Sequence, residues 1–416
     1  MVLVVVLFKL SIFRFRWQLM LLCCIHINVY YLLLECDMKK IVIIGNVASM
    51  MLRFRKELIM NLVRQGDNVY CLANDFSTED LKVLSSWGVK GVKFSLNSKG
   101  INPFKDIIAV YELKKILKDI SPDIVFSYFV KPVIFGTIAS KLSKVPRIVG
   151  MIEGLGNAFT YYKGKQTTKT KMIKWIQILL YKLALPMLDD LILLNHDDKK
   201  DLIDQYNIKA KVTVLGGIGL DLNEFSYKEP PKEKITFIFI ARLLREKGIF
   251  EFIEAAKFVK TTYPSSEFVI LGGFESNNPF SLQKNEIESL RKEHDLIYPG
   301  HVENVQDWLE KSSVFVLPTS YREGVPRVIQ EAMAIGRPVI TTNVPGCRDI
   351  INDGVNGFLI PPFEINLLAE KMKYFIENKD KVLEMGLAGR KFAEKNFDAF
   401  EKNNRLASII KSNNDF

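Results

Sequence analysis

The chain has few of the residues from which disulfides and metal sites are built. Its five cysteines show no paired spacing, so no disulfide framework is indicated and a reducing, cytosolic setting is favoured. Its four histidines lack metal-ligand spacing and no Asp-x-Asp pair occurs, so the sequence predicts no metal site. The cysteines are Cys23, Cys24, Cys36, Cys71 and Cys347, and the histidines are His26, His196, His294 and His301.

The chain is instead long, apolar and basic. Its 416 residues exceed one ordinary core and predict two domains, and 48% hydrophobic with 25% charged residues is typical of a folded globular protein. The net charge of +10 comes without any recognised nucleic-acid-reading motif, so we expect no nucleic-acid partner.

The first 37 residues differ from the rest. They hold two apolar runs separated by Lys9, Arg14 and Arg16, and the second run is short for a membrane span of about 20 residues. Directly after them, Met38-Lys-Lys-Ile-Val-Ile-Ile-Gly45 looks like a natural chain start leading into a strand. We interpret residues 1–37 as an extension outside the fold, from a misassigned start. A membrane anchor and a cleaved signal remain alternatives.

From Met38 onward, short apolar runs alternate with helical periods, which predicts parallel strands joined by crossover helices. The pattern restarts after Pro230-Pro231. We therefore predict an α/β fold of two doubly wound, Rossmann-like domains with a cleft between them. The predicted boundaries are 38–228, 229–395 and a C-terminal helical segment at 396–416. Predicted helices include 53–65, 198–205 and 348–352.

Two carboxylates eight positions apart, Glu323 and Glu331, form the most informative motif. Glu323 lies in a Gly/Pro loop after an apolar run, and Glu331 lies inside a helix predicted to start near Arg327. A helix N-terminus attracts a diphosphate, and a carboxylate further along can accept both hydroxyls of a ribose. An acidic surface loop followed by an amphipathic helix is the alternative.

A second pair of charges, Arg242 and Lys247, follows the first predicted strand of the second domain. A guanidinium fork and an ammonium at this place suit two phosphate groups. Alone, such a pair is more typical of ordinary surface charges. Combined with Glu323 and Glu331 in the same domain, it predicts a site for a diphosphate-containing ligand.

With these residues in place, the chain resembles the family 4 retaining glycosyltransferases, which have the two-domain GT-B fold. The resemblance spans about residues 38–400 and is closest to bacterial enzymes that extend lipid-carrier-linked oligosaccharides for O-antigen, capsule or N-glycan assembly. The matching pieces are 241–248, 271–273, 322–331, 344–346 and 353–357 in the second domain, and 39–45, 127–132, 153–156 and 216–225 in the first.

The resemblance implies a role for each donor-side residue. Arg242 and Lys247 would clamp the donor diphosphate, Glu331 would hold the ribose, and Glu323 would contact the transferred sugar. Electrostatic stabilisation of the leaving diphosphate would be the main catalytic contribution, without metal or cofactor. Backbone close to the sugar would come from Gly324, Val325 and Pro326. The base-binding loop would include Val302 and Glu303.

The acceptor side is less defined. Many relatives carry a histidine in the segment that corresponds to 127–132, and this chain has none there. Lys131 is a possible substitute, although a structural salt bridge is the alternative. His196 follows another strand, where a helix-capping role is equally compatible. Residues after the first strand that we expect to face the cleft and bind substrate are Gly45, Asn46 and Ser49.

An acid-free segment, 154–188, carries six lysines interleaved with Tyr, Trp, Ile and Leu. A basic amphipathic helix with aromatic residues is typical of docking to an anionic membrane surface. This predicts a peripheral protein on the cytoplasmic face of the inner membrane. The alternative is a helix that packs its apolar side on its own core.

The sequence therefore predicts a retaining glycosyltransferase. It would move a hexose or N-acetylhexosamine from a UDP-sugar to a polyprenyl-diphosphate-linked saccharide in bacterial surface polysaccharide or glycan assembly. A UDP-sugar 2-epimerase of the same fold is the main alternative. A dinucleotide-dependent oxidoreductase is disfavoured because Gly217-Ile-Gly219 lacks a third glycine, and a non-catalytic scaffold because the four charged donor-side residues are intact.

Overall fold

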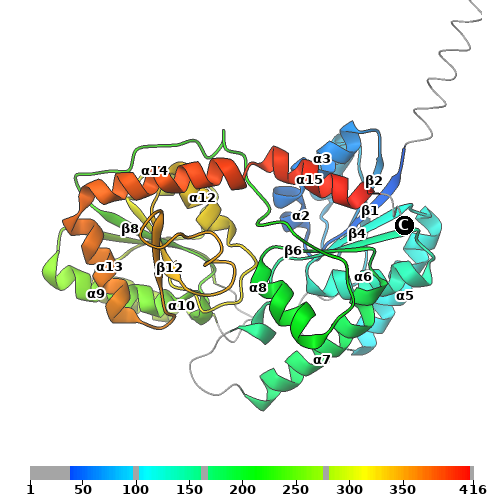
Figure 1. Cartoon of the computed structure of the whole chain (residues 1–416), viewed down its shortest axis with the longest axis horizontal. Coiled ribbons are helices and arrows are strands. Elements are labelled where there is room, and N and C mark those ends of the chain that lie inside the picture. Colours follow the sequence, from blue (N-terminus) through cyan, green and yellow to red (C-terminus); the bar gives the residue numbers. More distant parts are fainter. Residues whose placement is uncertain (1–37, 97–102, 161–166, 275–280, 413–416) are drawn as a thin grey trace, which may run out of the picture.

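The computed structural model describes residues 38–96, 103–160, 167–274 and 281–412, so the predicted N-terminal extension lies outside the described residues. Two lobes lie side by side, each built on a parallel sheet covered by helices (Figure 1). The predicted α/β class with two doubly wound domains is confirmed.

The first lobe contains the sheet nearest the N-terminus. Its strands are β1 (Lys40–Ile44), β2 (Asn68–Ala73), β3 (Lys90–Lys93), β4 (Ile124–Tyr128), β5 (Arg147–Ile152), β6 (Asp190–Leu193) and β7 (Val212–Val214), in the order β3-β2-β1-β4-β5-β6-β7. Its helices are α2 (Ala48–Phe54), α3 (Lys56–Arg64), α4 (Thr78–Ser86), α5 (Pro103–Ile120), α6 (Val130–Leu142), α7 (Thr168–Ala184) and α8 (His196–Asp198). Short helical turns lie at η1 (Asn157–Phe159), η2 (Leu185–Met187) and η3 (Lys199–Asp204), the last a π-helix.

The second lobe repeats the plan. Its strands are β8 (Thr236–Ile240), β9 (Glu267–Leu271), β10 (Ile297–Gly300), β11 (Val314–Leu317), β12 (Val339–Thr342) and β13 (Gly357–Ile360), in the order β10-β9-β8-β11-β12-β13. Its helical elements are η4 (Arg245–Lys247), α9 (Ile249–Thr262), α10 (Lys284–His294), α11 (Val305–Glu310), α12 (Arg327–Ile335), α13 (Ile365–Glu377) and α14 (Lys379–Asn396). A last helix, α15 (Ala399–Lys411), follows.

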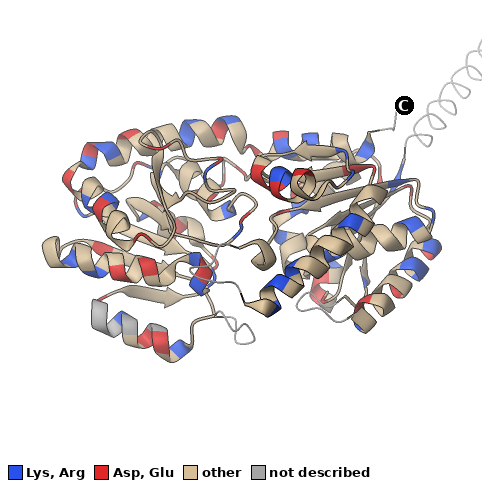
Figure 2. Ribbon diagram, turned by 60° about the horizontal axis from the view of Figure 1, so that its bottom comes forward, with Lys and Arg blue, Asp and Glu red and all other residues tan. Residues whose placement is uncertain are grey.

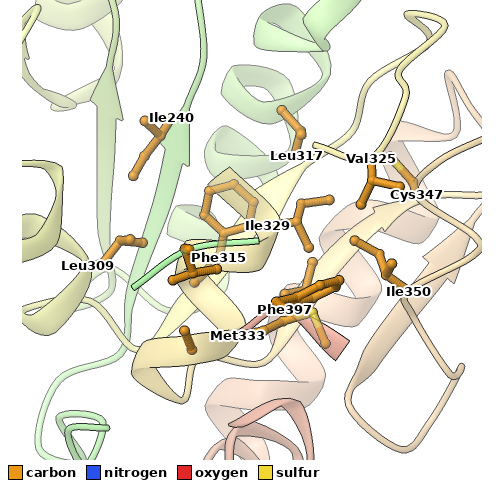
Figure 3. Packing of buried hydrophobic residues seen from close by; sticks show 14 of the residues in the cluster. Ile240, Leu309, Phe315, Leu317, Val325, Ile329, Met333, Cys347, Ile350 and Phe397 are labelled. Carbon is orange, nitrogen blue, oxygen red and sulfur yellow. The ribbon is translucent and has the colours of Figure 1, made fainter. Parts of the chain in front are cut away.

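The strands form where the apolar runs lie because both faces of each sheet are covered. The central strands β4, β8 and β11 are buried along their whole length, which is typical of parallel sheets between helical layers. In the second lobe, Phe315 of β11 packs with Ile329 and Met333 of α12, and Phe397 lies beside them (Figure 3). This packing holds α12 against the sheet.

Three predicted helices differ from the structure. The predicted helix 53–65 breaks at Arg55, whose φ of −117° separates α2 from α3. Residues 198–205 form α8 and the π-helix η3. Residues 348–350 form a turn and 351–352 have no regular structure, because Asn356 accepts from the backbone N–H of Asn352 and donates to the Ile350 carbonyl, groups that a continuing helix would use.

The chain crosses between the lobes twice, and the two crossings are tied together. Leu220 N–H donates to Phe397 O at 2.8 Å, and Ala399 N–H donates to Leu220 O at 3.0 Å. Beyond this point α15 returns to the first lobe and lies along α3 (Figure 1). There the buried Arg147 donates to the carbonyls of Ile409 (2.6 Å) and Ile410 (2.8 Å), which satisfies the helix C-terminus.

Arg337 anchors the first crossing to the second lobe. Its side chain is fully buried, and it donates to the backbone carbonyls of Lys228, Leu309, Glu310 and Ile335. Burial lowers the pKa of this guanidinium to about 10. A buried carbonyl without a donor lowers the stability of the fold. By satisfying these carbonyls, Arg337 holds the first crossing and the C-terminal ends of α11 and α12 in place.

We predict that Arg337→Met lowers the free energy of unfolding by about 3 kcal/mol, because several buried carbonyls lose their donor. The thermal midpoint should fall by at least about 5 °C. Arg64→Met is the control, since that side chain is 61% exposed and its partner Glu57 is 3.5 Å away. Equal midpoints for the two variants, measured by circular dichroism, would contradict the anchoring role.

Candidate active site

A pocket of about 310 Å³ opens at the carboxyl ends of the second lobe's strands and is closed on one side by α2 of the first lobe. Its walls bring together the four charged residues that the sequence singled out. The predicted residues that line it are Arg242, Lys247, Val302, Glu323, Pro326 and Glu331. The predicted residues outside its lining are Glu303, Gly324 and Val325.

The segment after β8 places Lys247 in the pocket. A 3₁₀ turn, η4, ends at Gly248, whose φ of +83° turns the chain into α9. A Cβ at Gly248 would lie 2.1 Å from Pro318 O, so only glycine allows this approach of the two segments. Lys247 is 9% exposed, contacts the Glu323 carboxylate, and lies 4.6 Å from the centre of the Tyr321 ring.

The N-terminus of α12 supplies a second source of positive potential. Pro326 occupies the N-cap position, and no side chain caps this end of the helix. Pro326, Arg327 and Val328 all line the pocket. Because the first amides of a helix have no intrahelical acceptor, this end can bind an anion next to Lys247.

Glu331 lies on the same helix, one turn further in, and is paired with Arg327. Its carboxylate accepts from Arg327 Nε at 3.1 Å and is almost fully buried. Burial raises the pKa of the Glu331 carboxyl above its usual value, against the attraction of Arg327 and Arg53. Glu331 is therefore a buried hydrogen-bond acceptor whose charged form is opposed by burial and favoured by Arg327 and Arg53.

The sequence analysis missed pocket residues that come from elsewhere in the chain. Arg53 and Phe54 extend from α2 of the first lobe, and His301 lies beside Val302. The guanidinium of Arg327 lies 5.4 Å from the centre of the Phe54 ring. No local pattern indicates these contacts, because Arg53 looks like an ordinary helix residue until the lobes come together.

The residues predicted to bind the acceptor differ in their surroundings. Gly45 is buried, and a Cβ there would lie 2.4 Å from the Tyr128 hydroxyl. Asn46 Oδ1 is buried without a hydrogen-bond partner in the described part of the chain, whereas Ser49 is exposed. Lys131 pairs with Asp106 at 2.8 Å, which favours its structural alternative.

At the end of β4, where the resemblance implies a histidine that this chain lacks, the structure holds a cluster of a different kind. The guanidinium of Arg55 lies 4.7 Å from the centre of the buried Tyr128 ring and pairs with Glu153. Phe129, which follows, has a φ of +69°, a conformation that bulky residues rarely adopt.

The helix α8 is capped by Asn195, while His196 is exposed. The geometry thus assigns the cap to Asn195.

The described residues lack two further kinds of feature. No group of three or more His, Cys, Asp or Glu side chains is placed to hold a metal ion among them. No helix in the described ranges combines the length and apolarity that crossing a membrane requires.

Known families match both lobes. The family described as "Glycosyl transferases group 1" matches residues 221–392, and the family "Glycosyl transferase 4-like" matches residues 40–192. A Campylobacter jejuni N,N'-diacetylbacillosaminyl-diphospho-undecaprenol alpha-1,3-N-acetylgalactosaminyltransferase is 26% identical over 83% of this chain and 91% of its own. An Escherichia coli UDP-Gal:alpha-D-GlcNAc-diphosphoundecaprenol alpha-1,3-galactosyltransferase is 32% identical over 63% of this chain and 68% of its own.

Solved structures show the same fold. A glycosyltransferase from Rickettsia africae superposes with a TM-score of 0.70 at 19% identity and covers 91% of this chain and 100% of its own. The Anabaena protein HepE in complex with UDP-glucose gives 0.70 at 16% identity, covering 90% and 100%. This confirms the predicted GT-B fold. With family matches in both lobes and a relative of this similarity in E. coli, the chain belongs to the group 1 glycosyltransferases.

Proposed function

We propose that this glycosyltransferase transfers a hexose or N-acetylhexosamine, with retention, from a UDP-sugar to a polyprenyl-diphosphate-linked saccharide. The convergence of Arg242, Lys247, Glu323 and Glu331 on one pocket carries the proposal. The C. jejuni and E. coli relatives are named for undecaprenol-diphosphate-linked saccharides, and the E. coli relative for UDP-Gal. Both are transferases, which favours transfer over 2-epimerisation.

In this proposal, different groups of the pocket act on the diphosphate, the ribose and the transferred sugar of the donor. Arg242, Lys247 and the N-terminus of α12 stabilise the leaving diphosphate as negative charge develops on it. Glu331 accepts hydrogen bonds from the ribose hydroxyls, which compete with Arg327 for its carboxylate. Because Lys247 contacts Glu323, a diphosphate bound to Lys247 competes with this ion pair and leaves the Glu323 carboxylate available to the sugar.

The surface of the first lobe supports the proposed membrane contact. Along α7, Met172, Trp175, Leu179 and Leu183 are 45–62% exposed and form one stripe, so this side of the helix does not pack on the protein's own core. Lysines flank the stripe, and basic residues recur along the front helices of this lobe in Figure 2. Lys163 and Lys165 lie outside the described residues.

A second stripe, which the sequence analysis did not single out, lies on α5. Phe104, Ile107, Ile108 and Tyr111 are 61–81% exposed, and the exposed Lys115 continues the same face. Both α5 and α7 pack against α6. Lys174 differs from the other α7 lysines because it is half-buried over the Phe159 ring at 4.4 Å. We propose that α5 and α7 together hold the protein at the cytoplasmic face of the inner membrane.

We predict that Arg242→Gln and Lys247→Gln each weaken UDP binding about 10-fold or more, because a hydrogen bond to a charged group contributes about 1.5–3 kcal/mol. Isothermal titration with UDP measures this. Arg245→Gln is the matched control, since Arg245 lies in the same turn but outside the pocket lining, half-exposed and paired with Glu286. Unchanged affinity for both test variants would place the diphosphate elsewhere.

EDTA should leave binding and turnover intact, and rescue of a lost activity by manganese would contradict the proposed metal-free donor site.

Glu323→Gln should lower turnover by roughly 10²–10³-fold, as expected for loss of one preorganised polar group at a reacting centre. UDP affinity should stay the same or rise, because Lys247 loses its competing partner. The measurement is sugar transfer at saturating donor, with UDP titration alongside. Turnover within threefold of the unchanged protein would rule out the assigned role.

The protein starting at Met38 should cosediment with anionic liposomes at low salt and dissociate as salt is raised, because surface charges are screened over about 8–10 Å. Replacing Met172, Trp175 and Leu179 by serine should abolish sedimentation without changing UDP affinity. Phe258→Ser is the control, since Phe258 is 44% exposed on the other lobe. If the Met38 form stays in the supernatant, residues 1–37 become the better candidate for the membrane contact.

A further inference from the structure

The loop that carries Glu323 is held by the opposite lobe. Arg322, the residue before it, donates from Nε to Asp198 Oδ1 at 2.8 Å and from Nη1 to Asp201 Oδ2 at 2.7 Å. Asp198 and Asp201 belong to α8 and η3 of the first lobe. Arg322 is 8% exposed and Asp198 is fully buried, so the ion pair between these two is shielded from water.

Asn195, the cap of α8, reaches the same loop. Its Nδ2 donates to the carbonyl of Gly324 at 2.7 Å and lies 3.4 Å from the carbonyl of Glu323. Its Oδ1 accepts from the backbone N–H of Asp198 at 2.7 Å. One buried side chain therefore connects the backbone around Glu323 to the helix that supplies Asp198.

The backbones of the two lobes also meet at this loop. A Cβ at Gly324 would lie 2.3 Å from Glu153 O, and a Cβ at Gly154 would lie 2.6 Å from Gly324 N. The Arg322 N–H donates to Thr160 Oγ1 at 3.2 Å. Contacts this close leave the loop little freedom while the lobes are together.

A contribution to folding stability does not explain why the Arg322–Asp198 ion pair is buried. Burial raises the pKa of the Asp198 carboxyl to about 6 even though Arg322 lowers it, so the ion pair does not fully offset the desolvation of the charges. A half-exposed pair nearby, Arg348–Asp197 at 3.3 Å, links the lobes without burial. Of these two ion pairs between the lobes, the buried one carries the larger desolvation penalty, and it lies next to Glu323.

We propose that Arg322, Asn195 and Asp198 are positioning residues that set the place of Glu323 for the transfer step when the two lobes are together. The inference rests on the proposed function. Apart from Arg53 and Phe54, the pocket is lined by the second lobe. Nucleotide binding therefore does not depend on these three residues, whereas the reacting geometry around Glu323 does.

The test compares Arg322→Gln, Arg322→Lys and Asn195→Ser in the full chain. Because small misplacements at a reacting centre can reduce rates about 10²-fold, we expect turnover to fall roughly 10- to 100-fold in Arg322→Gln and Asn195→Ser, with UDP affinity within threefold. Arg322→Lys, which keeps the charge, should recover part of the loss. Arg348→Gln is the control and should retain turnover within twofold.

A double-mutant cycle separates positioning from structural damage. If Arg322 acts through Glu323, adding Arg322→Gln to Glu323→Gln should produce little further loss of turnover. Losses that multiply, or a full-size loss in Arg348→Gln as well, would overturn the inference. So would turnover within threefold in both Arg322→Gln and Asn195→Ser.

The same cycle distinguishes the two proposals. If Glu323→Gln alone leaves turnover unchanged, the proposed function of the site fails. If Glu323→Gln is impaired while Arg322→Gln and Asn195→Ser are not, only the positioning inference fails. UDP titration shows for every variant whether the second lobe is folded. If Arg322→Gln does not fold, Asn195→Ser still tests the inference.

Discussion

The contact between Lys247 and Glu323 is the interaction around which the site is organised. It joins a cation suited to phosphate and a carboxylate suited to a sugar at the carboxyl ends of β8 and β11. Gly248 lets the two segments approach, and the uncapped start of α12 adds positive potential beside them. In the proposed function, an anionic ligand that binds Lys247 changes the surroundings of Glu323 at the same time, so this one ion pair would couple donor binding to the reaction.

Buried arginines tie this site to the architecture. Arg337 fixes the first crossing, Arg147 fixes the returning helix α15, and Arg322 joins the Glu323 loop to the first lobe. Each guanidinium has several donors in a planar fork, so one side chain satisfies several buried acceptors. The position of the lobes relative to each other is therefore set by directional polar contacts as well as by apolar packing.

The sequence predicted the strands and the charged residues of the pocket because both follow local rules. Apolar runs mark buried parallel strands, and residues that follow such strands meet at one edge of a sheet. Arg53 and Phe54 were missed because they reach the pocket from the other lobe, more than 100 residues away in the sequence. The partners of Arg322 were missed because they also lie more than 100 residues before it. The break at Arg55 and the turns around Asn356 depend on side-chain contacts that periodicity does not contain.

Retaining transfer from a UDP-sugar to a lipid-diphosphate-linked saccharide is the reaction proposed for this site. The most direct measurement incubates the full chain with a short-chain polyprenyl-diphosphate saccharide and, in turn, UDP-Gal, UDP-GalNAc, UDP-Glc, UDP-GlcNAc and GDP-Man, and assigns the anomer of the product by proton NMR. We expect one UDP-sugar to be consumed and the new bond to keep the α configuration of the donor. A β-linked product, use of GDP-Man alone, or an epimerised UDP-sugar without transfer would contradict the account.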